Sequence, residues 1–312
     1  MLESGTYDNA ALLITDQLGG VNQIIGISDT GLDLNSVYFF DNVTITPDAA
    51  SANTQHRKVV SYSTKVDTTC CDFSDVLDGH GTHGTCNVSL YLVITCFIVT
   101  GTALGSPYYS LDYGDFQRFK GVAPYAKVAF FDLSTNSTDS ITPPSDLNVG
   151  LLSKQYAYGA SIFSQSWGDS SNFGNYSSES LNVDEFMWSN PDALVLFAAG
   201  NHGDPNLTPG VNPSGSVTPP ATFKNGLTIG AGLNDAQSWT SFSEGTASAV
   251  LGVDAMAGFT SQGPTSDGRY KPDVLGPGFP VVSAEAFPAS YGKFHTGLVE
   301  KEGTSMATPG EP

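Results

Sequence analysis

The sequence predicts an α/β fold in which helices cover both faces of a mostly parallel central sheet. Along the 312 residues, short apolar runs suited to strands buried on both faces alternate with segments suited to helices. Alternation of this kind indicates parallel strands connected by helical crossovers. The predicted strands comprise residues 24–28, 127–133, 160–165, 193–199 and 226–231.

Two helices are predicted between these strands, at 146–158 and at 179–189, and each is closed by a helix-breaking Gly or Asn-Pro step. The chain contains neither an internal repeat nor a low-complexity linker, so we expect residues 1–312 to form a single domain. In open parallel sheets, ligand sites gather at the carboxyl ends of the strands. Asp29 and Asn201 both follow the end of a predicted strand.

Composition and charge restrict the class of partner. Hydrophobic residues make up 40% of the chain, with 18 Phe and 13 Tyr, which is enough to build a sizeable core. The net charge is −19, from 31 acidic residues against 12 Lys and Arg. Such a charge repels nucleic acids and anionic membrane surfaces, so neither is expected as a partner.

The expected location is the secretory pathway, either outside the cell or in the lumen of an endomembrane compartment. Residues 1–5 show neither the basic start nor the apolar run of a signal peptide, so we expect the N-terminus to be incomplete. Five glycosylation sequons are compatible with a secreted glycoprotein. They begin at Asn42, Asn87, Asn136, Asn175 and Asn206.

Four residue types suited to acyl transfer occur in separate short motifs. Asp29 ends an apolar run, where it is either a turn residue or a functional carboxylate, and His80 lies in a glycine-rich turn. Asn201 follows a predicted strand, and Ser305 follows Gly303 and Thr304. A serine becomes a strong nucleophile only when a base takes its proton and a carboxylate fixes the tautomer of that base. The oxyanion that forms needs preorganised donors, such as an amide side chain and a backbone N–H.

Three motifs resemble the active-site signatures of subtilisin-like serine proteases, the subtilases of peptidase family S8. They are residues 29–31, 80–83 and 303–309, and they occur in the same Asp, His, Ser order as in subtilisin. The resemblance extends over nearly the whole chain, from about residue 23 to 309. Further similar segments are 121–124, 164–168, 261–265 and 267–273.

The resemblance implies a three-layer subtilisin-like fold and a serine endopeptidase that hydrolyses peptide bonds of polypeptide substrates through an acyl-enzyme. It implies Ser305 as the nucleophile, His80 as general base and acid, Asp29 as the orienting carboxylate and Asn201 as an oxyanion donor. We therefore expect Asp29, His80 and Ser305 to lie close together, with the Asn201 amide facing them. The implied substrate-pairing segment is Ser164, Gln165, Ser166, Trp167 and Gly168.

Cofactors are not required by this reaction. Structural calcium ions are common in the family, but no loop of this sequence shows a recognisable calcium-ligand pattern. The turn at 79–84 formally fits a dinucleotide-binding fingerprint, which we reject because no apolar strand precedes it and Asp78 would repel a pyrophosphate. A zinc site is an open alternative, although the ligand spacing matches no zinc finger. Its ligands would be Cys70 or Cys71 with His80, His83 and Cys86.

His83 alone is expected to be a structural, hydrogen-bonded histidine rather than a second base, and Cys70 and Cys71 are expected to be loop thiols.

An apolar segment departs from the family pattern. Residues 84–100 separate the histidine motif from a Gly-Thr step at 101–102 that resembles its usual continuation. The core of this segment, 88–99, is strongly apolar but shorter than the ~20 residues of a membrane-spanning helix, so we do not expect membrane insertion. We interpret 84–100 as an insertion foreign to the fold, for instance translated intron. The alternative is a fully buried hydrophobic helix or an inserted strand. We expect 88–99 to fit the fold badly, either as an exposed apolar patch or as an extension of the helix that begins at His80.

The end of the sequence is the second departure. Seven residues follow Ser305, which leaves room for about two helical turns. We therefore expect the domain to be incomplete at its C-terminus, with part of the sheet left uncovered beside this helix. A catalytically inert product that keeps the fold, either truncated or a pseudoprotease, is the alternative function.

Overall fold

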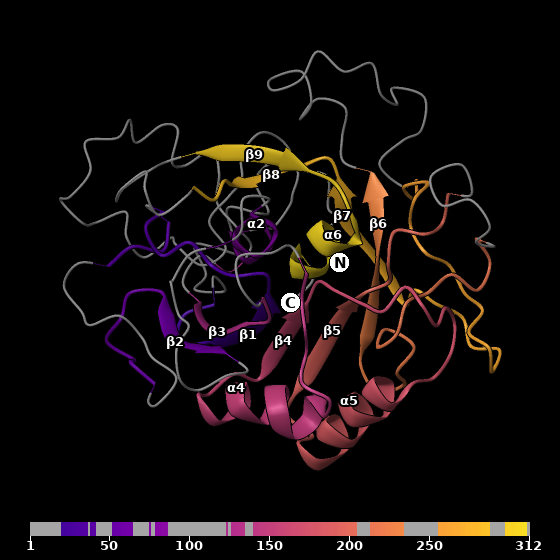
Figure 1. Ribbon diagram of the computed structural model, residues 1–312, viewed down its shortest axis with the longest axis horizontal. Helices are drawn as coiled ribbons and strands as arrows, with labels where there is room; N and C mark the ends of the chain where they lie inside the picture. Colours follow the sequence, from indigo (N-terminus) through magenta and orange to yellow (C-terminus); the bar gives the residue numbers. More distant parts are fainter. Residues whose placement is uncertain are drawn as a thin grey trace.

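Seven strands form the central sheet, and every pairing between them is parallel (Figure 1). In this computed structural model the described residues are 20–36, 38–41, 52–64, 75, 79–86, 123, 126–134, 140–204, 213–233, 255–287 and 297–310. The strands are β1 (Ile24–Asp29), β2 (Val59–Thr64), β3 (Lys127–Asp132), β4 (Ile162–Gln165), β5 (Leu194–Ala198), β6 (Leu227–Leu233) and β7 (Val274–Phe279). Their order across the sheet is β2-β3-β1-β4-β5-β6-β7.

The five strands predicted from apolar runs are confirmed as β1, β3, β4, β5 and β6, with ends that differ by at most two residues. The two outer strands were not predicted. All six residues of β2 are buried although half of them are polar, and β7 contains two glycines and Pro277, which lower strand propensity. Pairing with β3 and with β6 therefore decides the conformation of these two segments.

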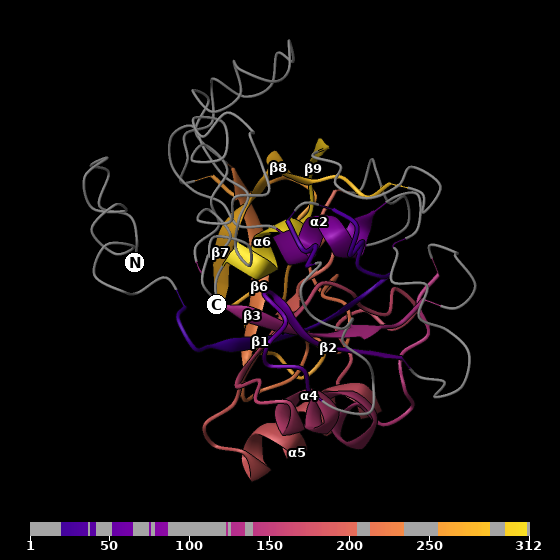
Figure 2. The same cartoon turned by 90° about the vertical axis from the view of Figure 1, so that its left-hand side faces the viewer.

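Helices cover both faces of the sheet, which confirms the predicted three-layer arrangement (Figures 1 and 2). One face carries the π-helical segment η2 (Asn148–Leu152), α4 (Ser153–Ala157) and α5 (Ser178–Ser189). The first two together form the helix predicted at 146–158, and α5 is the helix predicted at 179–189. The other face carries α2 (His80–Cys86) and α6 (Thr304–Ala307), which a single turn of 3-10 helix, η5 (Thr308–Gly310), continues.

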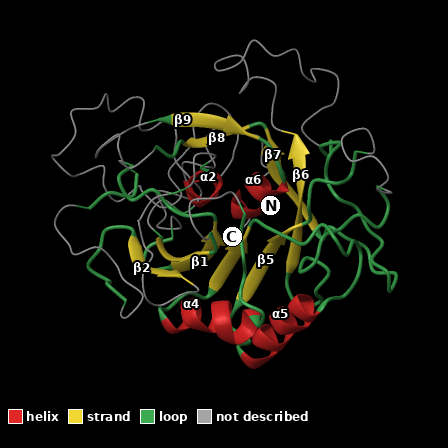
Figure 3. Cartoon of the chain, in the orientation of Figure 1, coloured by secondary structure: helices red, strands yellow, loops and turns green. Residues whose placement is uncertain are grey.

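A two-stranded antiparallel ribbon of β8 (Val281–Ala284) and β9 (Leu298–Lys301) lies beside α2 (Figure 3). The first three residues of the segment 84–100 belong to α2, which extends from His80 to Cys86. Its apolar core, 88–99, lies outside the described residues. Within the described part of the chain, no helix is long and apolar enough to cross a membrane.

The start and end of α5 follow from local sequence. Ser177 is the N-cap, and its side chain accepts a hydrogen bond from the backbone N–H of Ser180, 3.3 Å away. At the other end, the side chain of Asn190 donates to the carbonyl of Phe186 at 2.8 Å. Phe186 also packs edge-to-face on Phe163 of β4, with ring centroids 5.2 Å apart. This helix is thereby anchored to the centre of the sheet.

The strand order creates a switch point at β1. β2 and β3 lie on one side of β1, and β4 to β7 lie on the other. At such a point the connections leave in opposite directions, which opens a crevice outside the carboxyl end of the strand. Asp29 is the last residue of β1 and lies at that position.

Candidate active site

Asp29 and His80 form a direct hydrogen bond. The Nδ1 atom of His80 lies 2.7 Å from Oδ1 of Asp29, although 51 residues separate them in sequence. Asp29 is buried at the end of β1, whereas the His80 side chain is 27% exposed at the start of α2. A buried carboxylate is stabilised by such donors, and it accepts a second bond from the Thr30 N–H at 2.7 Å. The expected proximity of these two residues is therefore observed.

The contact depends on close packing of α2 against the turn after β1. Gly81 has no space for a side chain, because a β-carbon there would overlap the Gly31 carbonyl and lie 3.0 Å from Cβ of Asp29. The N–H of Gly81 donates to Oγ1 of Thr30 at 3.0 Å. A glycine after the histidine thus lets the helix approach the strand end and places the imidazole beside Asp29.

Ser305 lies in α6, which contacts α2 on the same side of the sheet (Figure 2). Its hydroxyl donates to the carbonyl of Ser166 at 3.0 Å, and the Ser166 hydroxyl donates back to the Ser305 carbonyl at 2.8 Å. Gly303 precedes the helix with φ 149°, a conformation that residues with a β-carbon rarely adopt. The backbone just before Ser305 therefore takes an extended conformation that favours glycine.

Asn201 is anchored against the residues immediately before Ser305. Its Oδ1 accepts two bonds from Thr304, one from the backbone N–H and one from the hydroxyl, both at 2.9 Å. Its amide nitrogen faces Gly303, 3.2 Å from where a β-carbon of that residue would be. The Thr304 hydroxyl also accepts from the Gly200 N–H at 3.1 Å. Sequence reasoning did not assign Thr304 a role, and its only signal was a hydroxyl residue next to the serine.

The structure corrects the expected substrate-pairing segment. Ser164 and Gln165 belong to β4, which is paired with β1 on one side and β5 on the other. Their backbone groups are therefore part of the sheet and have no free edge to offer a peptide. The remaining residues, 166–168, follow the end of β4 and lie beyond the sheet pairing. Trp167 is held there by a 2.9 Å bond from its indole N–H to the Ser28 hydroxyl.

His83 is a structural histidine, as predicted. Its Nε2 lies 3.2 Å from the carbonyls of both Val281 and Val299, so it donates to the ribbon formed by β8 and β9. Burial lowers the pKa of His83 to about 3, which keeps the ring neutral.

Metal binding has no support in the part of the chain that the structure describes. There, no group of three or more His, Cys, Asp or Glu side chains is arranged to hold a metal ion. Both histidines of the zinc alternative have other partners, and Cys70 and Cys71 lie outside the described residues.

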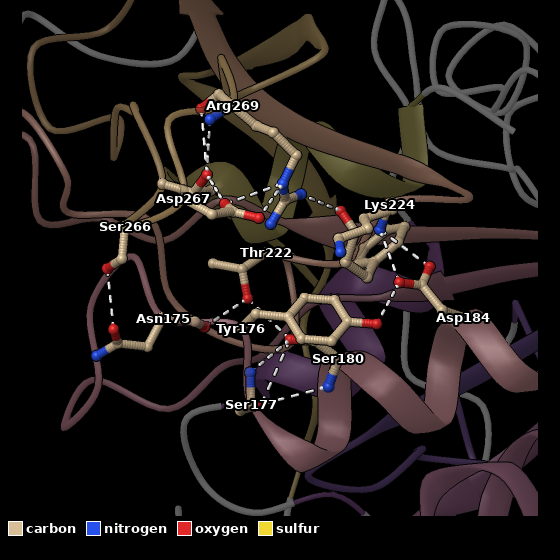
Figure 4. Close-up of polar contacts among 12 residues, drawn as sticks. Asn175, Tyr176, Ser177, Ser180, Asp184, Thr222, Lys224, Ser266, Asp267 and Arg269 are labelled. Atoms are coloured by element: carbon tan, nitrogen blue, oxygen red, sulfur yellow. Dashed lines mark hydrogen bonds and ion pairs between the residues drawn. The ribbon is translucent and has the colours of Figure 1, made fainter.

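A second polar cluster, between α5 and the loops that pack on it, is structural (Figure 4). Asp184 is buried, and its carboxylate accepts the Tyr176 hydroxyl at 2.7 Å and the backbone N–H groups of Lys224 and Asn225 at 2.9 and 2.8 Å. These bonds use both carboxylate oxygens within the protein. The cluster fixes the loop at 222–225 on the helix and contains no group placed for chemistry.

Comparison with known proteins decides the family. The model of the subtilase family, Peptidase_S8, matches residues 20–310. The chain belongs to the subtilase family. This confirms the resemblance seen in the motifs, and the family is one of serine proteases.

Among curated proteins, the chain is similar to two from Dictyostelium discoideum, the serine protease/ABC transporter B family proteins tagD and tagB. Each is 30% identical over 94% of this chain, which spans only 18% and 17% of their lengths. The serine protease AprX of Bacillus subtilis is 33% identical over 40% of this chain and 25% of its own length. This chain therefore corresponds to less than a fifth of the length of the tagD and tagB proteins.

Solved structures show the same fold. The CspB protease of Clostridium perfringens has a TM-score of 0.61 at 14% identity, covering 98% of this chain and 86% of its own. The prenylagaramide maturation protease PagA has a TM-score of 0.54 at 17% identity, covering 96% and 76%. At these identities the likeness establishes the subtilisin-like architecture.

Proposed function

We propose that this subtilase is a serine endopeptidase with Asp29, His80 and Ser305 as its catalytic triad. The observation that carries the proposal is the 2.7 Å hydrogen bond between Asp29 and His80 at the switch point of the sheet. Asp29 accepts from Nδ1 and so leaves Nε2 as the basic nitrogen of the ring. α6, which carries Ser305, contacts the helix that carries this ring.

The reaction needs no cofactor. Ser305 Oγ attacks the scissile carbonyl carbon while its proton passes to Nε2 of His80, and the carbonyl oxygen becomes an oxyanion. The amide of Asn201 and the Ser305 backbone N–H donate to that oxyanion. The C–N bond then breaks as His80 returns the proton to the leaving amine, and the acyl group stays on Ser305. Water, deprotonated by His80, then attacks the acyl carbon, the bond from that carbon to Ser305 Oγ breaks, and His80 returns the proton to Oγ.

The Ser305 hydroxyl must turn before it can react. It donates to the Ser166 carbonyl at 3.0 Å in this structure, and the proposed base is His80. Rotation about the Cα–Cβ bond of a serine moves the hydroxyl between staggered positions without moving the backbone. We propose that an extended substrate, pairing as an added strand with residues 166–168, competes for the Ser166 carbonyl and frees this hydroxyl.

Reaction with a fluorophosphonate tests the proposal. We expect covalent labelling of Ser305, located by peptide mapping, together with hydrolysis of a casein or fluorogenic peptide substrate. Ser305→Ala should abolish labelling, and His80→Ala should slow it by a factor of about 10⁴ or more. Labelling that survives Ser305→Ala would contradict the assignment. Absence of labelling in the folded wild-type protein would favour the inert alternative.

We also propose that the protein passes through the secretory pathway and is glycosylated. Asn175 begins the one sequon among the described residues, and it is exposed near the end of the loop that leads into α5 (Figure 4). Its Oδ1 accepts from the Ser266 hydroxyl at 2.9 Å, which leaves Nδ2, the atom that carries an N-glycan, directed outward. Expression with a secretory leader in a eukaryotic host should give a mass that falls on N-glycosidase treatment, with a smaller fall for Asn175→Gln.

A further inference from the structure

We propose that Asp75 is a positioning residue that keeps Asp29 and the imidazole of His80 in hydrogen-bonding position. It is a buried side chain that the reaction does not use directly, and it accepts hydrogen bonds from both segments that carry the pair. The inference depends on the catalytic roles proposed above for Asp29 and His80.

The two oxygens of Asp75 bridge those segments. Oδ1 accepts the Thr30 hydroxyl at 2.8 Å, and Thr30 directly follows Asp29. Oδ2 accepts the backbone N–H of Thr82 at 2.6 Å, and Thr82 is two residues beyond His80 in α2. A single side chain thereby connects the end of β1 to α2.

The Thr30 hydroxyl connects Asp75 to the segment that carries His80. It donates to Asp75 and at the same time accepts the Gly81 N–H at 3.0 Å. The Thr30 backbone N–H donates to Oδ1 of Asp29, the same oxygen that bonds to His80. Asp75 therefore fixes the direction of the Thr30 hydroxyl, and Thr30 fixes the oxygen that orients the imidazole.

Burial disfavours the charged form of Asp75. Burial raises the pKa of Asp75 to about 7, the bonds from Thr82 and Thr30 oppose that rise, and the charge of Asp29 adds to it. Burial, and to a smaller extent the charges of Asp132 and Asp75, raise the pKa of Tyr62 in β2. Two carboxylates whose charges interact are typical of functional sites.

Proton NMR of the full chain tests the inference without relying on activity. The Nδ1 proton of His80, shared with Asp29, should give a low-field resonance that His80→Gln removes. We expect Asp75→Asn and Thr30→Val to shift or broaden this resonance, and Thr30→Ser, which restores a hydroxyl, to return it toward its wild-type position. The Nε2 proton of His83, which donates to two backbone carbonyls, should stay unchanged as an internal reference.

Kinetics supply the second readout. We expect kcat, normalised to titrated active sites, to fall by about 10- to 100-fold in Asp75→Asn and in Thr30→Val, with a much smaller change in KM. The matched control is Asp184→Asn, another buried aspartate with both oxygens bonded, but on α5 at the opposite face of the sheet. It should lower the free energy of unfolding and leave both kcat and the His80 resonance unchanged.

The outcomes separate this inference from the proposed function. If Ser305 is not labelled but the His80 resonance responds to both substitutions, the proposed function fails and Asp75 still positions the pair. A His80 resonance that is the same in wild type, Asp75→Asn and Thr30→Val would overturn the inference, whatever the labelling. Equal effects of Asp75→Asn and Asp184→Asn on kcat would also overturn it, because they would indicate a general loss of stability.

Discussion

Gly81 packs against the carbonyl of Gly31 so closely that a β-carbon at Gly81 would overlap this oxygen. In contrast, among the described residues the nearest atom to a β-carbon at Gly84, one turn further along α2, would be Oδ2 of Asp29 at 3.8 Å. Close packing therefore requires a glycine at position 81, whereas position 84 has room for a β-carbon. The difference gives a matched pair of substitutions.

We expect Gly81→Ala to push α2 away from the end of β1 and to lengthen the Asp29–His80 bond. A displacement of about 1 Å at reacting groups lowers kcat/KM by roughly 10²-fold. Gly84→Ala should keep the activity and raise the free energy of unfolding by about 0.5–1 kcal/mol, because alanine favours the helix. Peptidase assays and urea unfolding measure both quantities, and equal activities of the two variants would contradict the expectation.

Asp29→Asn is expected to lower kcat by about 10⁴-fold at neutral pH. The carboxylate accepts a proton-bearing Nδ1 at 2.7 Å, whereas an amide of the same shape can present an N–H and favour the other tautomer of His80. Nε2 would then carry the proton and could not act as a base. Steady-state kinetics with a peptide substrate check this, and circular dichroism controls for folding. Activity within tenfold of wild type would remove Asp29 from the triad.

Thr304→Val should impair both stability and catalysis. The hydroxyl that valine lacks donates to Oδ1 of Asn201 at 2.9 Å and accepts from the Gly200 N–H at 3.1 Å. Leaving that N–H without a partner is expected to lower the free energy of unfolding by about 1–3 kcal/mol. Asn201 also loses one of its two anchors beside Ser305, so kcat should fall more than KM changes.

Thr304→Ser keeps the hydroxyl and serves as the control for that substitution, since it removes a methyl group only. If valine and serine at this position gave the same kcat, Thr304 would not orient Asn201.

The pH dependence of stability should report on His83. Burial lowers its pKa from 6.5 to about 3, so between these values the unfolded chain binds a proton that the folded protein does not. Stability is therefore complete above about pH 6.5 and decreases as the pH falls toward 3. The decrease amounts to about 1.4 kcal/mol per pH unit for one group, or about 2 kcal/mol between pH 6.5 and 5.

The comparison with His83→Gln isolates this contribution. Burial also lowers the pKa of His56 to about 4, with the same sign, and raises the pKa of Asp75 to about 7, with the opposite sign. Both groups are common to wild type and variant, so they cancel in the difference. Urea unfolding at several pH values should show a shallower dependence in His83→Gln, and parallel curves would contradict a neutral, buried His83.

Local sequence pattern was sufficient to predict the interior strands of the sheet and to select the residues proposed for the reaction. Strands β1, β3, β4, β5 and β6 are apolar runs because both of their faces are buried, and that requirement is visible in sequence. The strand segments β2 and β7 were missed, since half of β2 is polar and β7 contains glycine and proline. Their conformation depends on the neighbouring strand.

The sequence by itself determined the fold class and the family, and it supplied the Asp, His, Ser and Asn candidates, because those properties lie in short motifs and in the periodicity of burial. Only the tertiary structure decided which groups meet. Asp75 bonds to Thr30 across 45 residues, Asn201 to Thr304 across 103, and Ser305 to the carbonyl of Ser166 across 139. Those contacts follow from the strand order and from the packing of two helices on one face of the sheet, neither of which any local segment specifies.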